Sequence, residues 1–518
     1  MKKISDSLNI QIGTILSFAT LFANILIYIF YTPFLLNIVG DKQYGIYSFT
    51  LGITTWFSFA ISSISVGYVK FNATSKGKDS KYNSKTVNGC YFLLFSFYTL
   101  LVLIAGCIFV ALLTSRVIVF DKYTQDEQNL ICVMFIITIL SLIPTLLFHV
   151  FSSSVFANGK FIWYRSSLLL NLLLRTAISI PFLLMGFGIV SVLTIHCVVN
   201  VALAAADFFY AYFGLKIRFS FKTIKEHKYL FKDIFFFTGA LLINEIADKL
   251  NSSVDSLVLG STGYAVELAH YSLGMRIAEY SSQAILTISK NLAPTIHNNV
   301  VLKKHEENKK LFNNISRIQV ILMALLIGGF AVCGNEFINL WLGKGYEDVY
   351  VVCLVLMILY SYMATTIMTQ DIERANNKHL GRSLIILGTV LLNAILTVVF
   401  VKIFPSDKVI YGCLLGTAVG IIIGYCIILS IYHKKSVDMP MGSYWFFVLK
   451  IALLVFPGVI ICLNLNLIFP LIESNSIISF LAKGFVFIVL FVTLIALFNR
   501  DQLKNIIGKF KNRRKTNV

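Results

Sequence analysis

Long apolar stretches alternate with short polar segments along the whole chain. A transmembrane helix needs about 20 predominantly apolar residues, and fourteen stretches of the chain reach that length. They are 9–36, 44–69, 86–113, 130–153, 163–186, 188–214, 234–260, 266–289, 314–341, 348–370, 380–402, 409–432, 444–469 and 475–498. The pattern therefore predicts an all-α polytopic membrane protein with about 14 transmembrane helices.

The composition agrees with a membrane protein. Hydrophobic residues make up 57% of the 518 residues, and charged residues only 13%. The first stretch follows a short polar start, and no small-residue cleavage pattern comes after it, so we expect an uncleaved span. The nine cysteines occur singly, without Cys-x-x-Cys or Cys/His clusters, so neither a disulfide framework nor a metal site is expected.

The excess of basic residues lies on one side of the expected membrane. With the N-terminus inside, the inward segments hold 33 Lys and Arg against 10 Asp and Glu, and the outward segments hold 6 against 10. Cytoplasmic loops are rich in Lys and Arg, so we expect a multi-pass protein of the cytoplasmic (inner) membrane with both termini in the cytoplasm. The basic loops then face anionic headgroups, not nucleic acid.

Two Gly-rich hairpins indicate an internal repeat. The run Val-Gly-Asp-Lys-Gln-Tyr-Gly-Ile-Tyr-Ser at 39–48 and the Leu-Gly at 51–52 align with 259–274, with a two-residue gap. Each hairpin follows the first span of a six-span half. We therefore expect two six-helix lobes related by a pseudo-two-fold axis, with two appended helices and a binding site between the lobes. The expected divisions are an N-terminal lobe at 1–214, a cytoplasmic linker at 215–233, a C-terminal lobe at 234–433, appended helices at 434–498 and a basic cytoplasmic tail at 499–518.

The same residues resemble a known family. The Val39–Ser48 run is similar to the first outward loop of polysaccharide and O-antigen (Wzx-like) flippases, in the MATE-like multidrug/oligosaccharidyl-lipid/polysaccharide exporter superfamily. Leu292-Ala293-Pro294, Gly334–Ile338 and Trp341-Leu342-Gly343 follow in the order and spacing typical of that family. The resemblance covers spans one to twelve. It implies a central cationic cavity and export of a lipid-diphosphate-linked oligosaccharide by alternating access, for cell-surface polysaccharides such as the O-antigen of lipopolysaccharide.

The charged residues inside the expected spans include ten candidates for a position within the membrane. They are Arg175, Asp207, Glu245, Asp248, Lys249, Asp255, Arg276, Glu279, Lys450 and Lys483. An unpaired charge at the bilayer centre costs at least about 2.5–3.5 kcal/mol, so each needs a partner, a wet cavity or a route to the interface. Lys450 and Lys483 lie close enough to the ends of their spans for the ammonium group to extend to the interface.

Spans seven and eight carry the densest group of charges. The group comprises Glu245, Asp248, Lys249, Asp255, Arg276 and Glu279. The three acidic residues of span seven share one helical face, and the pair on span eight returns to a similar depth. Two interpretations stay open: a closed ion-pair network that joins two helices, or a cavity lining that binds a coupling cation such as Na⁺ or H⁺.

Arg175, near the middle of span five, is a candidate for substrate binding together with Arg276 and Lys249. A planar guanidinium matches two oxygens of a diphosphate at once. The alternative is an ion pair between Arg175 and Asp207 of span six, whose expected depths differ by about two helical turns. Asp207 is otherwise a candidate member of the ion-coupling network, and Asn24 in span one is a candidate gating residue.

Three classes of function follow from these features. A flippase would bind a lipid-linked oligosaccharide, with membrane lipids and a glycan polymerase as candidate partners, and would need no catalytic residue or cofactor. Because the chain has no GxxxxGK[ST] run, its energy would come from an ion gradient, the membrane potential or consumption of product. A MATE-type cation or drug antiporter would have an acidic cavity without an essential arginine. A membrane glycan polymerase or acyltransferase would need a large outward catalytic loop, and the outward loops here are short.

The charge asymmetry predicts the topology. In a cysteine-free background, a cysteine at Asp121 should react with a membrane-impermeant maleimide added from outside, and a cysteine at Lys225 should not. Both should react after permeabilisation, which controls for reactivity. The reverse pattern would show that the orientation is inverted.

Overall fold

The computed structural model describes residues 2–76, 82–115, 120, 122–221, 228–289, 292–376, 378–465 and 476–498. Within these ranges every regular element is a helix. The α-helices are α1 Lys2–Ser58, α2 Ala60–Ser75, α3 Ser84–Thr114, α4 Gln125–Ala157, α5 Phe161–Leu184, α6 Gly188–Phe209, α7 Lys228–Ser261, α8 Ala265–Thr287, α9 Ala293–Val301, α10 His305–Trp341, α11 Glu347–Ala375, α12 His379–Ile403, α13 Val409–Ile421, α14 Ser430–Val437, α15 Met441–Leu463 and α17 Ser476–Phe498. Two π-helices, η1 Tyr210–Gly214 and η5 Ile422–Leu429, and a 3₁₀ turn, η4 Ser406–Lys408, complete the set.

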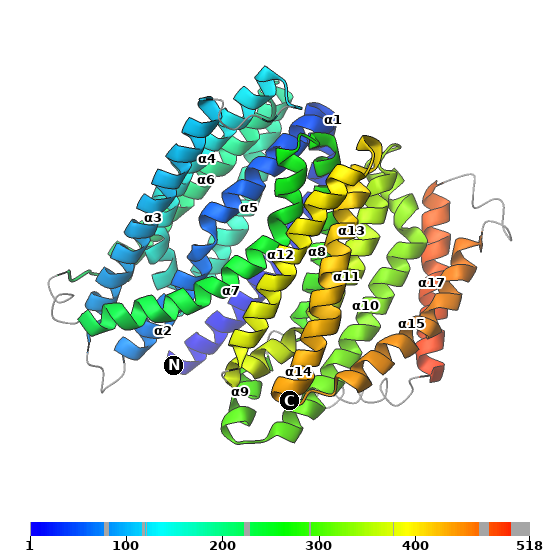
Figure 1. Cartoon of the computed structure of the whole chain (residues 1–518). Coiled ribbons are helices and arrows are strands. Elements are labelled where there is room, and N and C mark those ends of the chain that lie inside the picture. Colours follow the sequence, from blue (N-terminus) through cyan, green and yellow to red (C-terminus); the bar gives the residue numbers. More distant parts are fainter. Residues whose placement is uncertain are drawn as a thin grey trace. The chain divides into compact units, whose positions relative to one another are not determined.

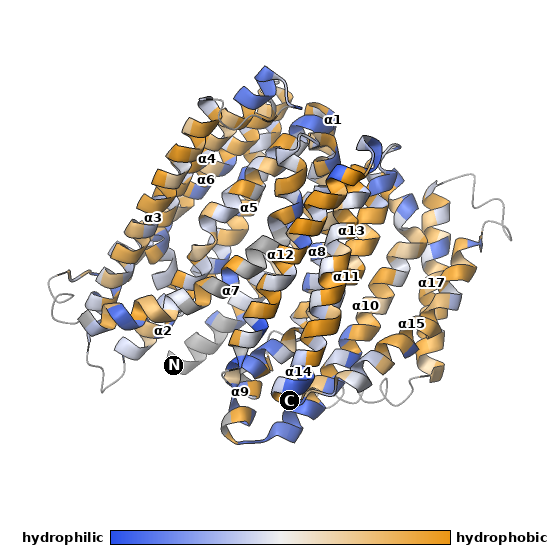
Figure 2. Cartoon of the chain, viewed as in Figure 1, coloured by the Kyte–Doolittle hydropathy of each residue, from blue (hydrophilic) through white to orange (hydrophobic). Residues whose placement is uncertain are grey.

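The described helices account for all fourteen apolar stretches, and the predicted all-α polytopic fold is confirmed. Eleven helical segments are long and apolar enough to cross a membrane by length and composition alone. One of them, Gln11–Ser75, contains the first two expected spans. The charged helices α7 and α8 account for spans seven and eight. Apolar residues cover most of helices such as α3 and α10 in Figure 2.

The chain forms two compact units. The first consists of Met1–Ala269 and Thr397–Cys413, and the second of His270–Leu396 and Leu414–Val518. In the first unit, α4 packs against α3 and α6, α5 packs against α1 and α6, and α7 contacts α1 and α2 (Figure 1). In the second unit, α10 packs against α11, α15 and α17. The lobe boundaries expected from the sequence stay predictions, and residues 222–227 of the expected linker lie outside the described ranges.

Glycines shape the first hairpin and the close packing around it. Gly40 has φ 77° and ψ 163°, a conformation that residues with a Cβ rarely adopt, so the bend between the first two spans depends on glycine. A Cβ on Gly45 would lie 1.8 Å from the carbonyl oxygen of Ala265, and a Cβ on Gly260 would lie 2.0 Å from the ring of Phe49. The two Gly-rich hairpins that align in the sequence therefore pack directly against each other.

Aromatic side chains fill the core of the first unit. The buried rings of Tyr68 and Tyr91 meet edge to face, with centroids 5.3 Å apart. The Tyr68 hydroxyl donates to Asn88 Oδ1 at 2.7 Å, and Asn88 Nδ2 donates to the carbonyl of Arg218 at 3.0 Å. These bonds fix the segment after η1 to α3, and satisfy polar groups that would be costly to bury alone.

A buried ion pair joins α17 to α10 in the second unit. Lys483 Nζ lies 2.6 Å from Glu336 Oε1, which also accepts a hydrogen bond from Ser479 Oγ at 3.0 Å. The Lys483 and Glu336 side chains are only 7% and 15% exposed. The expectation that Lys483 extends to the interface is therefore wrong. Its ammonium group stays inside the unit because an acidic partner is available there.

The Lys483–Glu336 pair should be required for stability. Replacing Lys483 with Met leaves a buried carboxylate without its cation, which costs about 3–5 kcal/mol. Thermal unfolding of the purified protein should therefore begin at a clearly lower temperature. The double variant Lys483→Met/Glu336→Leu should recover most of the loss, and Lys450→Met, at an exposed position, serves as the control. Equal stability of Lys483→Met and wild type would contradict a stabilising pair.

Candidate functional site

Arg175 lies among hydrogen-bonding side chains of α1 and α6. The guanidinium on α5 is within electrostatic range of Tyr31 and Tyr47 on α1 and of His196 on α6. Tyr47 and His196 share a hydrogen bond of 3.1 Å between the hydroxyl and Nδ1. The Tyr31 hydroxyl lies 2.7 Å from Ser179 Oγ, one turn beyond Arg175 on α5. This polar group combines one fixed positive charge with several hydroxyls, a chemistry suited to phosphate and sugar oxygens.

Asp207 does not pair with Arg175. Its carboxylate accepts hydrogen bonds from Ser152 Oγ and from Trp163 Nε1, the latter at 2.8 Å. Asp207 is 7% exposed, and Trp163 also stacks on Tyr210 with ring centroids 4.1 Å apart. Among the described residues, no acidic side chain forms an ion pair with Arg175. The alternative interpretation of Arg175 as a structural partner of Asp207 is therefore excluded.

The charges of span seven contact other helices of the first unit. Glu245 on α7 accepts a hydrogen bond from Ser62 Oγ on α2. Asp255, only 4% exposed, accepts from Thr397 Oγ1 on α12 at 3.3 Å, and the thiol of Cys413 on α13 also interacts with it. The side chains of Asp248 and Lys249 lie outside the described part of the chain, so their predicted roles stay predictions.

The charges of span eight pair with each other. Arg276 Nη1 lies 2.8 Å from Glu279 Oε2, one turn along α8. The side chains are 49% and 28% exposed, so this ion pair is partly open and contributes about 0–1 kcal/mol to stability. Asn24 is half-buried on α1, and its predicted gating role stays a prediction.

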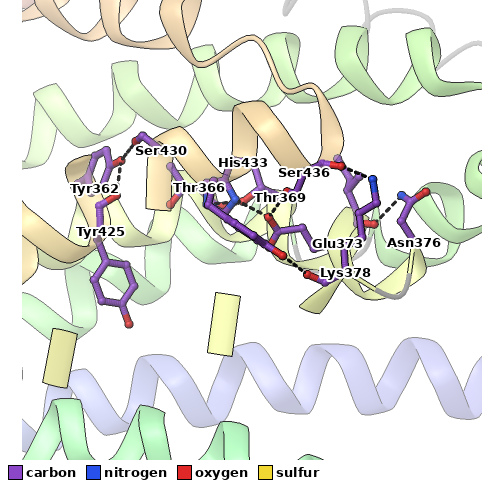
Figure 3. A network of polar contacts seen from close by, with 12 residues as sticks. Tyr362, Thr366, Thr369, Glu373, Asn376, Lys378, Tyr425, Ser430, His433 and Ser436 are labelled. Atoms are coloured by element: carbon purple, nitrogen blue, oxygen red, sulfur yellow. Dashed lines mark hydrogen bonds and ion pairs between the residues drawn. The ribbon is translucent and has the colours of Figure 1, made fainter. Parts of the chain in front are cut away.

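The described residues also include polar sites that the sequence analysis missed. A pocket of about 420 Å³ lies between the first hairpin and the start of α4, where Lys42 Nζ is 2.6 Å from Glu127 Oε1. A second site links Glu373 on α11 to His433 on α14 at 2.8 Å (Figure 3). Both members of that pair lie just beyond the ends of their expected spans, which explains why a search for intramembrane charges passes over them. In the part of the chain that the structure describes, no group of three or more His, Cys, Asp or Glu residues could hold a metal ion.

The fold and its apolar helices define a multi-span helical membrane protein. The family model described as "Polysaccharide biosynthesis protein" matches residues 93–351. That match covers half of the chain, and the chain belongs to this family of polysaccharide biosynthesis proteins. No curated protein matches the sequence.

Solved structures with a similar fold include flippases and exporters. The lipid II flippase MurJ, in an inward closed conformation, has a TM-score of 0.67 and 14% identity, with 96% of this chain and 100% of that chain covered. An inward-facing multidrug resistance MATE family transporter of the MOP superfamily has a TM-score of 0.63 and 13% identity, with 82% and 96% covered. The MATE multidrug transporter DinF-BH has a TM-score of 0.57 and 14% identity, with 85% and 97% covered. These similarities show the fold that the chain shares with them.

Proposed function

We propose that the protein is a flippase that moves a lipid-diphosphate-linked oligosaccharide from the inner to the outer leaflet of the cytoplasmic membrane. Its family belongs to polysaccharide biosynthesis, and its fold is similar to that of a lipid II flippase. The single observation that carries the proposal is the setting of Arg175. A cation among tyrosine hydroxyls, without an acidic partner in the described structure, is suited to an anionic substrate.

Arg175 and Arg276 would bind the diphosphate, with Lys249 as a third cation. The planar guanidinium of arginine donates two parallel hydrogen bonds to a phosphate, so geometry as well as charge contributes to binding. The hydroxyls of Tyr31 and Tyr47 would accept and donate hydrogen bonds to sugar or phosphate oxygens. The lipid chains would stay in the bilayer, because only the polar head requires a wet path.

The buried acids would couple transport to a cation gradient. Asp255 with Thr397 offers oxygen ligands suited to Na⁺ or an acceptor for H⁺, and it is 4% exposed. Asp207 is surrounded by neutral donors, so it also has capacity for a positive charge. Glu245, Asp248 and Glu279 would complete the ion-coupling network, and Asn24 would act as a gate on α1. In the same proposal, the transported glycan is an O-antigen unit of lipopolysaccharide. A glycan polymerase is the proposed protein partner.

A MATE-type cation or drug antiporter is the second candidate. It is favoured by the similarity to several MATE transporters and by the buried carboxylates of Asp207 and Asp255. In that case the acids would bind the transported cation directly. Arg175 and Arg276 would then have no role in substrate binding, which makes the two functions separable by mutation.

Substitutions at Arg175 and Arg276 test the flippase proposal. Lysine keeps the positive charge but loses the paired donors, and glutamine loses both. We expect the lysine variants to retain partial glycan export. Each glutamine variant should export about 10- to 100-fold less, as expected for loss of a hydrogen bond to a charged group. Lipid-linked glycan at the outer leaflet of cells should be measured for each variant, together with protein abundance in the membrane.

Two controls make the result interpretable. Arg165→Gln alters another α5 arginine, which lies over the ring of Tyr164 with 5.5 Å to its centroid, and should leave export unchanged. Arg276→Ala should leave abundance near wild type, because the Arg276–Glu279 pair is partly exposed. If Asp255→Asn abolished efflux of an organic cation dye while the arginine-to-glutamine changes had no effect on either transport activity, the antiporter function would be correct.

A further inference from the structure

A buried carboxylate–imidazole pair connects α11 to α14 (Figure 3). Glu373 and His433 have side chains 0% and 2% exposed, and Glu373 Oε1 lies 2.8 Å from His433 Nδ1. Ser436 Oγ on α14 donates a second hydrogen bond to the same oxygen, at 3.1 Å. Both contacts hold α14 against α11 within the second unit.

The surrounding hydrogen bonds favour one placement of the protons. Thr369 Oγ1 donates to the carbonyl of Thr366 at 2.6 Å, so it accepts from His433 Nε2 at 3.1 Å. His433 therefore carries a hydrogen on Nε2. The contact between Nδ1 and Glu373 Oε1 then requires one further proton, because without it two lone pairs would face each other. With that proton the pair has zero net charge, whichever of the two atoms holds it.

Among the described residues, the second carboxylate oxygen of Glu373 is buried and has no hydrogen-bond partner. A buried acceptor that stays unsatisfied is costly, and a buried negative charge is more costly still. The pair is therefore stable in this setting only while it holds its proton. Loss of that proton would leave one full negative charge on a pair whose side chains are only 0% and 2% exposed.

Two of the charged or titratable groups close to the pair bind backbone carbonyls. Lys378 Nζ donates to the carbonyl of Ser436 at 2.5 Å, and the Tyr432 hydroxyl donates to the carbonyl of Lys378 at 2.6 Å. Further charged or titratable groups on α9, α11, α12, α14 and α15 include His297, Asp371, Arg374, Arg382, Lys434, Lys435 and Tyr444. In the described ranges, His433 is the single ion-pair partner of Glu373. The pair therefore depends on its own proton for charge balance.

The π-helix η5 lies directly before α14. A π-helical segment inside a transmembrane helix has irregular backbone hydrogen bonds and often marks a functional position. Tyr362 on α11 donates its hydroxyl to the carbonyl of Tyr425 in η5 at 3.2 Å and also lies 2.9 Å from Ser430 Oγ. α14 is thus held against α11 by Tyr362 at Ser430 and, one turn further along α14, by Glu373 at His433 (Figure 3).

We propose that Glu373 and His433 form a proton-binding site that controls the docking of α14 on α11. With the shared proton bound, α14 stays docked. When the proton passes from the pair to water, the buried charge drives α14 away from α11 about η5, which hydrates the carboxylate. An effect of this docking on transport would rest on the proposed function. The proton-controlled docking of α14 itself does not rest on it.

Hydrogen exchange of the full-length protein in lipid nanodiscs tests the site without any substrate. The amides of 431–437 should be followed from about pH 6 to about pH 9, with rates corrected for the intrinsic effect of pH. If release of α14 is coupled to loss of one proton, protection should fall by up to about tenfold per pH unit. Unchanged protection of wild type over this range would overturn the proposal.

Two substitutions and a control distinguish a proton site from a purely structural contact. Glu373→Gln supplies an amide N–H to His433 Nδ1 in place of the shared proton, so α14 should stay protected at every pH. His433→Gln removes the imidazole and should leave α14 weakly protected at neutral pH. Asp371→Asn, two residues before Glu373 on α11, should keep the wild-type pH dependence. A Glu373→Gln variant with wild-type pH dependence would assign the effect to another group. Failure of the flippase proposal would leave all of these results unchanged.

Discussion

The need to compensate charge inside an apolar medium governs the structure of this protein. Hydrocarbon offers no hydrogen bonds, so each buried ionisable group must find a partner in the chain or a wet surface. Lys483 pairs with Glu336 at 2.6 Å, and Asp207 accepts hydrogen bonds from Ser152 and Trp163. These contacts join helices that are distant in the sequence. The same requirement makes Arg175 notable, because its neighbours in the described structure are hydroxyls and an imidazole.

The fold follows closely from the sequence because hydropathy acts locally. A stretch of about 20 apolar residues can satisfy its backbone only as a helix in lipid, and the described helices accordingly include all fourteen stretches. The Gly-rich hairpins were also recognisable. Their direct contact was not, because alignment of two segments says nothing about the approach of Gly45 to Ala265 or of Phe49 to Gly260. Close approach depends on how helices far apart in the chain come together.

The polar sites were less predictable, since their partners are neutral or distant residues. The partners of Asp207 are a serine and an indole, and neither side chain carries a charge that the sequence pattern could have connected to it. Glu373 and His433 are 60 residues apart and lie beyond the apolar stretches, so periodicity does not connect them. Lys483 shows the same limit, because a lysine near the end of a span looks equally suited to the interface. Only the packing of α17 on α10 decides its partner.

Three observations support the proposed flippase function: the polysaccharide biosynthesis family, a fold similar to that of a lipid II flippase, and a cation set among hydroxyls. The proposed function requires that the protein alone moves a lipid-diphosphate-linked oligosaccharide across a bilayer. The most direct measurement uses purified protein in liposomes that carry a fluorescent polyprenyl-diphosphate oligosaccharide and an imposed Na⁺ or H⁺ gradient. A membrane-impermeant quencher reports the leaflet that the glycan occupies. If the protein is a flippase, glycan should move between leaflets in a gradient-dependent way in protein-containing liposomes, and it should not move in empty ones. Glycan that stays in its original leaflet under every gradient, while the same liposomes transport an organic cation, would contradict the proposed function.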